Sequence, residues 1–514
     1  EKTLLQGELI PRLLYQLDGV TYAKHEEIPF YHKQQRVVLE NCGSSDAEDI
    51  EEYIAKGGYA GFEKALFEMT DEEICRSIID SGLRGRGGGG FPAGRKWESV
   101  RLQPTGKKYV VCNGDEGDPG AFMDRSIMEG NPHSIIEGML IAVAAGSDEG
   151  YIYVRAEYPL AVSRLKTAIA KAEEMGLLGD NILGTDFCFH LHVNRGAGAF
   201  VCGEGSALTA SIEGNRGMPR VKPPRTVEQG LWARPTVLNN VETFSNVPLI
   251  IRRGSAWYRS IGTERSHGTK AFALTGKIKN TGLVEIPMGT TLRTIVEEIG
   301  GGIPGGKKFK AAQTGGPSGG CLTEEHLDVP LDFDSVKKYN AIIGSGGMVV
   351  MGQDTCMVEV ARFFMNFTQN ESCGKCVPCR EGTRRMLEIL TRIVNNEGSL
   401  EDLDLLEDLS STITETALCG LGQSACKPVQ STLKYFRDEY LAHVVEKHCP
   451  HCNGRKKELH IDPELCKGCG KCMRQCPMEA ISGQIRMPHV IDTEKCIKCG
   501  ACWGCCPFGA IREE

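Results

Sequence analysis

Hydrophobic residues along the first half of the chain recur with two different periods, which predict two kinds of element. A spacing of three to four residues predicts helices over Asp71–Asp80, Ser134–Ala145 and Leu160–Met175. Continuous or alternating apolar runs predict strands over Lys108–Cys112, Tyr151–Arg155 and Phe187–Val193. Because helices and strands follow one another in turn, we expect a layered α/β domain over residues 61–250.

The second half of the chain predicts a small α+β domain and then a helical one. Within residues 251–345, strands are expected over Ala271–Lys277 and Gly282–Ile286, and a short helix over Leu292–Ile299. Within residues 346–447, helical spacing predicts a small bundle over Thr355–Phe367, Gly382–Asn395, Leu400–Glu415 and Pro428–Lys447. A linker at 448–458 leads to a cysteine-rich tail at 459–514, and residues 1–60 form an N-terminal extension without a clear pattern.

Length and charge exclude some classes of partner. The chain has 514 residues, 41% of them hydrophobic and 25% charged, which allows roughly three to five domains. Its net charge of −8 offers no basic excess to nucleic acid or to an anionic membrane surface. The apolar stretch Ile135–Gly146 contains Glu137 and is well short of the roughly 20 residues of a membrane helix. We therefore expect neither a nucleic acid nor a membrane as a partner.

The 23 cysteines are distributed unevenly. Seven lie singly in the first 370 residues, and sixteen lie between Cys373 and Cys506, mostly two residues apart. Such spacing is typical of metal clusters, whereas a disulfide scaffold is usually a short secreted chain. We therefore expect thiolate ligands in a reducing cytoplasm.

Two matching cysteine runs dominate the tail. Cys466-x2-Cys469-x2-Cys472-x3-Cys476-Pro477 is followed by Cys496-x2-Cys499-x2-Cys502-x3-Cys506-Pro507. This is the spacing of a ferredoxin module with two [4Fe-4S] clusters, in which the fourth cysteine of each run ligates the other run's cluster. One cluster should use Cys466, Cys469, Cys472 and Cys506, and the other Cys496, Cys499, Cys502 and Cys476, which leaves Cys505 spare. Paired zinc knuckles are the alternative, but they would use two pairs of cysteines per site.

A third cluster motif opens the helical domain. Cys373, Cys376 and Cys379 offer three thiolates on one loop, and a cluster needs a fourth. Cys419 is the expected fourth ligand, with Cys426 as its rival.

A further metal site is predicted at the linker. Cys449 and Cys452 are too few for a cluster, but with His443 or His448 they could bind zinc. Cys356 or Cys426 would complete the set, and a pair of merely buried thiols is the alternative.

Three glycine-rich or acidic segments of the α/β domain suit a flat phosphorylated ligand. The first runs from Gly82 to Pro92, with Arg86 and Lys96 nearby, and free backbone N–H groups there can bind phosphate. The second, Asn113–Gly120, follows a buried strand, where α/β sheets bind ligands. The third, Gly196–Ala207, brings small residues to the start of a helix. A flexible loop and a solvated turn are the alternatives for the first two.

Together with residues 219–224 (PRVKPP), 236–243 (TVLNNVET) and 372–382 (SCGKCVPCREG), these segments resemble the flavin subunit of respiratory complex I and of soluble hydrogenases and formate dehydrogenases. The resemblance implies an FMN-binding α/β domain, a ubiquitin-like α+β domain and a helical domain with one [4Fe-4S] cluster. The implied FMN contacts are Gly85, Arg86, Gly87, Gly88, Lys96, Asn113, Asp115, Glu116, Gly203, Glu204, Asn239, Asn240 and Thr243. The implied nucleotide contacts are Phe91, Lys96, Phe200, Gly205 and Arg225. The chemistry belongs to FMN, with Glu116 and Glu204 near it, and no protein nucleophile or base is expected.

The tail resembles that of the β subunit of electron-bifurcating [FeFe]-hydrogenases. This resemblance implies a cytoplasmic hetero-oligomer with a hydrogenase large subunit and with ferredoxin. Residues 1–60 lack the cysteines of a [2Fe-2S] domain, so a small thioredoxin-like [2Fe-2S] subunit is an expected partner. Lys467, Lys471, Arg474, Lys495 and Lys498 could steer ferredoxin to the tail or form a solvated face.

Two departures from the family pattern bear on the nucleotide. Gly205 replaces a glutamate that usually follows the CGE motif, and Arg225 replaces a phenylalanine after KPP. Loss of a negative charge and gain of a guanidinium suit a phosphate group, so we expect NADP(H) rather than NAD(H), unless these positions simply tolerate change. A formate dehydrogenase or complex I-like subunit is the alternative function. From another class, an electron-transfer scaffold without flavin chemistry is also considered.

Overall fold

The computed structural model describes residues 7–17, 19–104, 106–449, 451, 459–476, 478–493, 495–496 and 501–513. The chain forms two compact units, Glu1–His451 and Cys452–Glu514. No helix among the described residues is long and apolar enough to cross a membrane.

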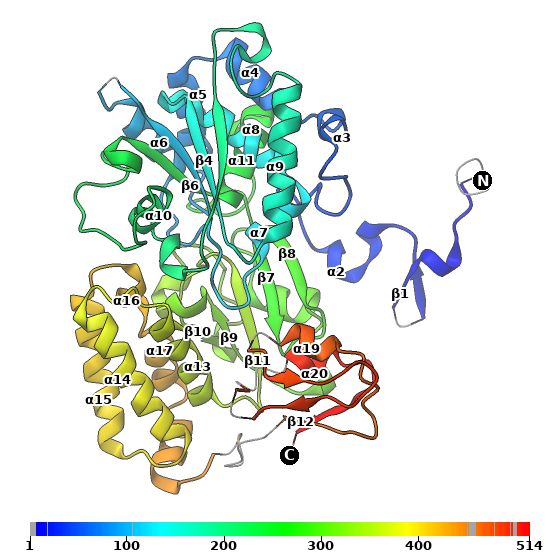
Figure 1. Ribbon diagram of the computed structural model, residues 1–514, viewed down its shortest axis with the longest axis vertical. Coiled ribbons are helices and arrows are strands. Elements are labelled where there is room, and N and C mark those ends of the chain that lie inside the picture. Colours follow the sequence, from blue (N-terminus) through cyan, green and yellow to red (C-terminus); the bar gives the residue numbers. More distant parts are fainter. Residues whose placement is uncertain are drawn as a thin grey trace. The chain divides into compact units, whose positions relative to one another are not determined.

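A parallel sheet of four strands forms the centre of the first domain (Figure 1). Its order is β5-β4-β3-β6, from the strands β3 (Tyr109–Gly114), β4 (Glu149–Val154), β5 (His190–Arg195) and β6 (Thr236–Asn240). Because side chains alternate along a strand, Val110, Cys112 and Ile152 enter one hydrophobic core. Val111 and Tyr153 face the other side and pack with the segment around Leu208. Both faces are therefore covered, as a buried parallel sheet requires.

The helices of this domain include the three that the apolar spacing predicts. They are α4 (Ala60–Glu68), α5 (Asp71–Ser81), α6 (Ala93–Arg101), α7 (Met123–Gly130), α8 (Pro132–Ala142), α9 (Pro159–Glu174), α10 (Gly205–Ile212), α11 (Val241–Arg253) and α12 (Ser255–Arg259). A Cβ on Gly138 of α8 would lie 2.2 Å from the carbonyl oxygen of Phe244, so glycine permits the close approach of α8 to α11. The strand expected over Phe187–Val193 begins three residues later, because Phe189 pairs instead with Gly179 in an isolated bridge.

The second domain contains a mixed sheet of five strands in the order β10-β9-β11-β7-β8. The strands are β7 (Thr269–Gly276), β8 (Gly282–Pro287), β9 (Phe309–Thr314), β10 (Cys321–Thr323) and β11 (Gly347–Gly352). The expected helix is a π-helical turn over Thr294–Ile299. Since β11 pairs with both β7 and β9, the predicted domain boundary at residue 345 is too early by one strand.

The helical domain consists of α13 (Met357–Asn370), α14 (Val377–Val394), α15 (Leu400–Thr416), α16 (Gly420–Ser424), α17 (Lys427–Tyr435) and α18 (Arg437–Leu441). Helix α14 begins five residues earlier than expected, with a proline in its first turn, where proline is tolerated. The single helix expected over Pro428–Lys447 is instead α17, α18 and a π-helical turn over Ala442–Glu446.

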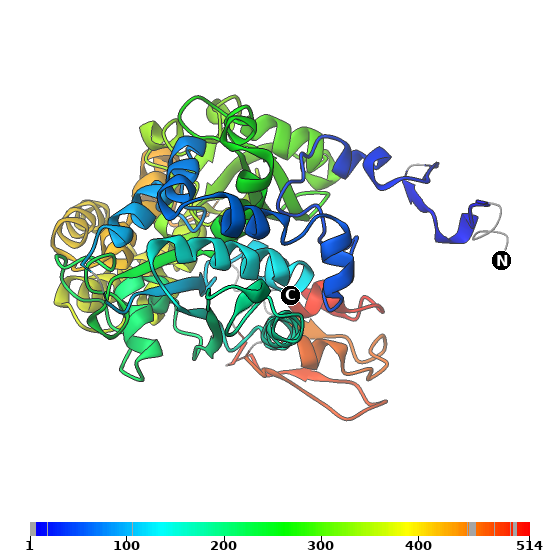
Figure 2. The ribbon, with the colours of Figure 1, turned by 90° about the horizontal axis from the view of Figure 1, so that it is seen from above.

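The N-terminal extension contains elements that its sequence does not announce. They are β1 (Tyr15–Leu17), β2 (Val20–Tyr22), α2 (Pro29–His32) and α3 (Ile50–Ala55), of which α3 lies beside α9 (Figure 2). The backbone N–H groups of Val37, Val38 and Leu39 all donate to the buried carboxylate of Glu285 in β8, at 2.9–3.0 Å. These hydrogen bonds tie the extension to the second domain.

The second unit is small. Strand β12 (Leu459–Ile461) pairs with β15 (Ile511–Glu513), and β13 (Ile481–Ser482) pairs with β14 (Val490–Ile491). Two short helices, α19 (Lys471–Gln475) and α20 (Ala501–Cys505), complete it. Cysteines make up much of its core.

Candidate functional site

The glycine-rich loop at residues 85–90 lies against the N-terminus of α11, at the carboxyl edge of the parallel sheet. A Cβ atom on Gly87 would stand 2.8 Å from Cβ of Asn240, so only glycine allows this approach. The N–H of Arg86 donates to Oγ1 of Thr243 at 2.9 Å, and Oδ1 of Asn240 caps the helix. Backbone N–H groups at a helix N-terminus form a ready site for phosphate.

The guanidinium of Arg86 points into the protein, not toward this loop's open side. It is fully buried and donates to the carbonyl oxygens of Thr269 and His267 and to the hydroxyl of Tyr258, at 2.6–3.0 Å. Any contact of Arg86 with a flavin therefore falls to its backbone.

Buried carboxyl groups line the loop that follows β3. Glu116 accepts the N–H groups of Asp124 and Arg125 at 3.0 Å each, and burial raises its pKa to about 7. Burial also raises the pKa of Asp115 to about 7, although Arg155 lies 3.9 Å away. Oδ2 of Asp115 and Oδ1 of Asp124 are buried and have no hydrogen-bond donor within the described part of the chain. These oxygens can accept hydrogen bonds from a ligand.

Glu204 is occupied as the N-cap of α10. Its carboxylate accepts the N–H groups of Ser206 and Ala207, and Nζ of Lys222 lies 2.5 Å away. Burial opposes ionisation of Glu204, but the hydrogen bonds from Lys222 and Ser206 outweigh it and lower its pKa. Glu204 thus orients α10 and the loop that carries Lys222.

The two positions expected to select the nucleotide lie beside this cap. A Cβ on Gly205 would meet Leu238 and Thr226 at 3.5 Å, which is ordinary contact distance. The guanidinium of Arg225 is exposed and makes no hydrogen bond or ion pair within the described residues. Room at position 205 and a free cation at position 225 therefore occur together.

The remaining expected contacts are placed around the same edge. Asn113 donates to the carbonyl oxygen of Gly203 at 2.9 Å. Nζ of Lys96 donates to the carbonyl oxygen of Leu238 at 3.1 Å, and burial lowers its pKa to about 8. Phe91 is half exposed, Phe200 packs on Phe367 of α13, and Asn239 is buried in β6.

The second domain also holds the glycine-rich loop, which the sequence does not reveal. Asp334 forms an ion pair with Arg84 at 2.8 Å. The ring of Phe333 lies 4.6 Å below the guanidinium carbon of Arg84 and against Gly90, where a Cβ would come within 2.8 Å. Gly344 forms a backbone bridge with Gly88. Residues 333–344 therefore form a clamp under the loop, here called the loop clamp.

Four cysteines of the helical domain line one cavity. Cys373, Cys376, Cys379 and Cys419 meet there, with Lys375 and Leu421 beside them. Cys426 lies elsewhere, with its Sγ 3.5 Å from Sδ of Met386. Of the two candidates for the fourth position, Cys419 is thus the one that faces the other three.

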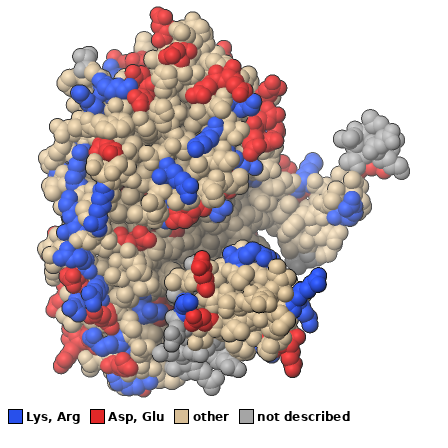
Figure 3. Space-filling view, viewed as in Figure 1, with Lys and Arg blue, Asp and Glu red and all other residues tan. Residues whose placement is uncertain are grey.

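This cavity adjoins the first domain. Nζ of Lys375 donates to the carbonyl oxygen of Pro219 at 2.6 Å, and Arg216 donates to that of Cys373 at 3.3 Å. Cys373 and Leu421 pack against the hydrophobic cluster under α10. Basic side chains gather on the edge of the first unit that carries α10 and α14 (Figure 3).

A second group of metal-binding side chains lies at the base of the helical domain. Cys356, His443 and Cys449 are buried, and their ligand atoms all lie within 4.8 Å of one another. Nδ1 of His443 contacts Oδ1 of Asn396 at 2.7 Å, which orients the ring. His448 is exposed, and Cys452 lies outside the described residues.

The tail brings together the first predicted set. Cys466, Cys469, Cys472 and Cys506 line one cavity. Of the second set, Cys476, Cys496 and Cys502 contribute to the small core, and Cys499 lies outside the described residues. Lys467, Lys471, Arg474 and Lys495 are exposed, and Lys498 is not among the described residues.

The donor groups fit the expected cofactors. The glycine-rich loop leaves open space at Gly89, where a Cβ would meet nothing within 4 Å. The unpartnered oxygens of Asp115 and Asp124 suit the N–H and hydroxyl groups of a flavin. Four thiols around one cavity suit a cubane cluster.

Comparisons with known proteins identify the family. The family model for the Nuo51 FMN-binding domain matches residues 78–249, and that for the SLBB domain matches 272–322. The NADH-ubiquinone oxidoreductase-F iron-sulfur binding region matches 359–443, and the 4Fe-4S binding domain matches 459–482 and 489–512. The NADP-reducing hydrogenase subunit HndC of Solidesulfovibrio fructosivorans is 54% identical over 459 residues, covering 89% of this chain and 93% of that protein. The chain belongs to the family of NAD(P)H-oxidising flavin iron–sulfur subunits.

Other members of the flavin iron–sulfur family are also similar. An NADH-quinone oxidoreductase flavin-family protein of Rhizobium meliloti, the F 2 polypeptide of that enzyme, is 47% identical over 415 residues, covering 80% of this chain and 99% of that protein. The crystal structure of an NAD+-reducing [NiFe]-hydrogenase in the air-oxidized state matches with a TM-score of 0.70 and 33% identity, covering 80% of this chain and 67% of that chain. These matches confirm the expected family, the FMN-binding domain and the presence of [4Fe-4S]-binding regions.

Proposed function

We propose that this chain is the diaphorase subunit of an NADP-linked, electron-bifurcating [FeFe]-hydrogenase. It would exchange electrons between NADP(H), hydrogenase and ferredoxin, in a hetero-oligomer with the hydrogenase large subunit and a small thioredoxin-like [2Fe-2S] subunit. The observation that carries the proposal is the contact between the four-cysteine cavity and the loop at Pro219, since it brings cluster ligands to the nucleotide side of the flavin domain. A reducing cytoplasm suits the thiolates.

Residues at the carboxyl edge of the parallel sheet would hold the flavin. The glycine-rich loop and the first turn of α11 offer N–H groups to its phosphate. Asn113, Asp115 and Glu116 lie where they can bind its ring or ribityl chain. Bound FMN supplies the conversion between two-electron hydride transfer and single electrons. The protein's own part is to place the nucleotide and to exclude water around it.

The nucleotide is proposed to be NADP(H). The unpaired guanidinium of Arg225 can bind the 2′-phosphate, and Gly205 leaves no carboxylate to repel it. Phe91 offers an exposed ring, and Lys96 a buried amine, on the same side.

Three [4Fe-4S] clusters are proposed. The first would be held by Cys373, Cys376, Cys379 and Cys419. In the tail, one would be held by Cys466, Cys469, Cys472 and Cys506, and the other by Cys476, Cys496, Cys499 and Cys502. The exposed lysines of the tail would guide ferredoxin.

Zinc is proposed for the remaining ligand group. Two thiols and an imidazole form three of the four ligands of a structural zinc site. Cys452 would be the fourth.

Anaerobic reduction of the purified chain tests the proposal. FMN should be released on denaturation, and NADPH should bleach the flavin absorbance of the isolated subunit faster than NADH. A chain without flavin would be the electron-transfer scaffold, and a preference for NADH would remove the NADP assignment. A co-purifying formate dehydrogenase or quinone-linked subunit would replace the hydrogenase assignment, which the similarity to NADH-quinone oxidoreductase subunits keeps as the second candidate.

A further inference from the structure

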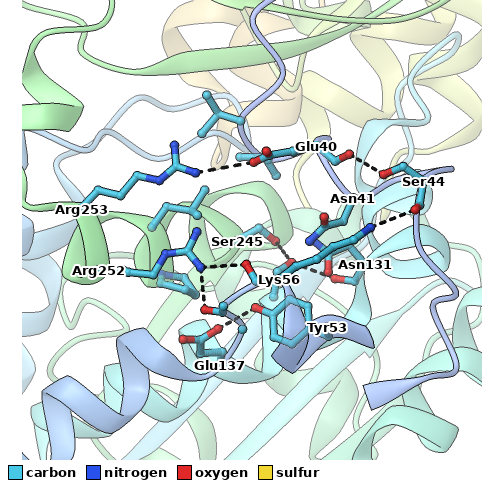
Figure 4. Close-up of a pocket in the computed structure, with 17 residues that line it drawn as sticks. Glu40, Asn41, Ser44, Tyr53, Lys56, Asn131, Glu137, Ser245, Arg252 and Arg253 are labelled. Carbon is cyan, nitrogen blue, oxygen red and sulfur yellow. Dashed lines mark hydrogen bonds and ion pairs between the residues drawn. The ribbon is translucent and has the colours of Figure 1, made fainter. Parts of the chain in front are cut away.

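A cavity of about 380 Å³ lies between the N-terminal extension and the helices that cover one face of the parallel sheet. Its walls come from residues 37–44, the end of α3, the start of α8 and the second half of α11 (Figure 4). None of its lining residues belongs to the proposed flavin, nucleotide, cluster or zinc sites. Pockets for small molecules commonly have volumes of about 300–1,000 Å³. This cavity is therefore large enough for a ligand.

Polar groups without protein partners face this cavity. The side-chain amides of Asn41 and Asn131 make no hydrogen bond within the described residues, although Asn131 is only 8% exposed. Between them and α11, the hydroxyl of Ser134 lies 3.1 Å from that of Ser245. An unsatisfied buried polar group costs about 1–3 kcal/mol. A ligand with its own donors and acceptors would remove that cost.

Basic groups surround the same cavity. Lys56, Arg252 and Arg253 line it, against the carboxyl groups of Glu40 and Glu137. Only one terminal nitrogen of Arg252 is engaged, with two backbone carbonyl oxygens at 2.6 and 3.3 Å. Arg253 lies 3.7 Å from Glu40, and burial raises the pKa of Glu137. The cavity therefore carries an excess of positive charge.

We propose that this cavity binds a small hydroxylated organic anion. Its phosphate or carboxylate would lie against Lys56 and Arg252, because guanidinium and ammonium groups bind such anions with charge-assisted hydrogen bonds. Its hydroxyl or carbonyl groups would meet Asn41, Asn131 and Ser245. The site is distinct from the flavin cradle, since the two lie at opposite ends of α11, roughly 20 Å apart along the 13-residue helix.

Isothermal titration calorimetry on the cofactor-loaded full chain tests this site. Saturating NADP+ keeps the nucleotide site filled, and the probes are ribose 5-phosphate, citrate and uncharged ribose. At least one of the two anions should bind at a single site, about tenfold or more tighter than ribose. Saturation by ribose 5-phosphate or by citrate identifies a phosphate or a carboxylate ligand respectively.

Two variants locate the binding. Asn131→Asp keeps the size of the side chain but adds a negative charge, and Arg252→Gln removes a positive one. Each should weaken anion binding about tenfold or more. Arg76→Gln is the matched control, because Arg76 pairs with Asp80 on the exposed face of α5; it should bind as the wild type does.

Two results would overturn the proposal. One is the absence of saturable heat in the wild type with either anion up to about 10 mM. The other is equal affinity in wild type and Asn131→Asp, which would place the anion elsewhere. If Arg252→Gln fails to fold, Asn131→Asp alone decides, with its melting temperature as the check on folding.

Discussion

At the scale of single residues, position 205 offers the sharpest test of nucleotide selection. We expect Gly205→Glu to lower kcat/KM for NADPH relative to NADH about tenfold or more, roughly 1.4 kcal/mol. The added carboxylate would repel the 2′-phosphate, while the Cβ meets its neighbours at 3.5 Å without strain. Steady-state rates with ferricyanide as acceptor measure this ratio.

Gly205→Ala is the control for Gly205→Glu, because it adds the Cβ without the charge. It should keep the wild-type ratio of NADPH to NADH. An unchanged ratio in Gly205→Glu would show that position 205 does not select the nucleotide.

His133 makes the stability of the first domain sensitive to acid. Its ring is buried beside Tyr59, and burial lowers its pKa from 6.5 to about 4. Below pH 6.5 the unfolded chain takes up a proton that the folded chain does not, so stability falls as the pH falls toward 4 and is constant above 6.5. Between pH 7 and pH 5 this amounts to about 2 kcal/mol.

We therefore expect the melting temperature of the wild type to fall more steeply between pH 7 and pH 5 than that of His133→Gln. Glutamine retains an acceptor for the hydroxyl of Tyr59 but does not titrate. Parallel curves for the two proteins would contradict the assignment.

At the scale of elements, the loop clamp should control flavin affinity. Asp334→Asn removes the ion pair with Arg84, and Phe333→Ala removes the ring under Gly90. We expect either change to weaken FMN binding several-fold without loss of iron, as measured by flavin fluorescence and iron analysis. Asp328→Asn is the matched control, since Asp328 pairs with Arg293 on the surface of the same domain. Equal flavin loss in the control would assign the effect to general destabilisation.

The zinc site should respond to its ligands separately from the clusters. Cys356→Ser and His443→Ala should each lower bound zinc, because each removes one of three adjacent ligands. Cys321→Ser, a buried cysteine in β10, is the control. Metal analysis of zinc and iron measures both; a wild type that purifies without zinc would refute the site.

The sequence predicts the elements whose patterns are local, and it misses those that depend on distant contacts. Alternating and continuous apolar runs identify β3 and β4, and cysteine spacing groups the ligands that line each cavity. The loop clamp is invisible because it joins residues about 250 positions apart, as the ion pair between Arg84 and Asp334 does. Helix α3 is short and packs only as part of the assembled domain. The burial of the Arg86 guanidinium likewise depends on β7 and α12.

At the scale of the whole molecule, the two compact units should have separable roles. A chain ending at residue 458 should lose about two thirds of its iron, because two of three proposed clusters lie beyond it. It should still reduce ferricyanide with NADPH but no longer reduce ferredoxin.

Cys469→Ser in the full chain controls for the truncation, since it alters one proposed tail cluster without removing the unit. Ferredoxin reduction should fall in this variant too, while ferricyanide reduction persists. Undiminished ferredoxin reduction by the truncated chain would show that electrons leave the first unit directly.

The loop clamp also sets an order of events during synthesis. The flavin-binding residues end at Thr243, yet the clamp that supports their loop ends at Gly344, and its sheet closes only with β11 at Gly352. At roughly 5–20 residues per second, a ribosome needs several seconds to add that stretch. During this interval the nascent chain has its flavin-binding segments but not the support beneath them. Flavin incorporation therefore belongs to the end of the first unit's synthesis.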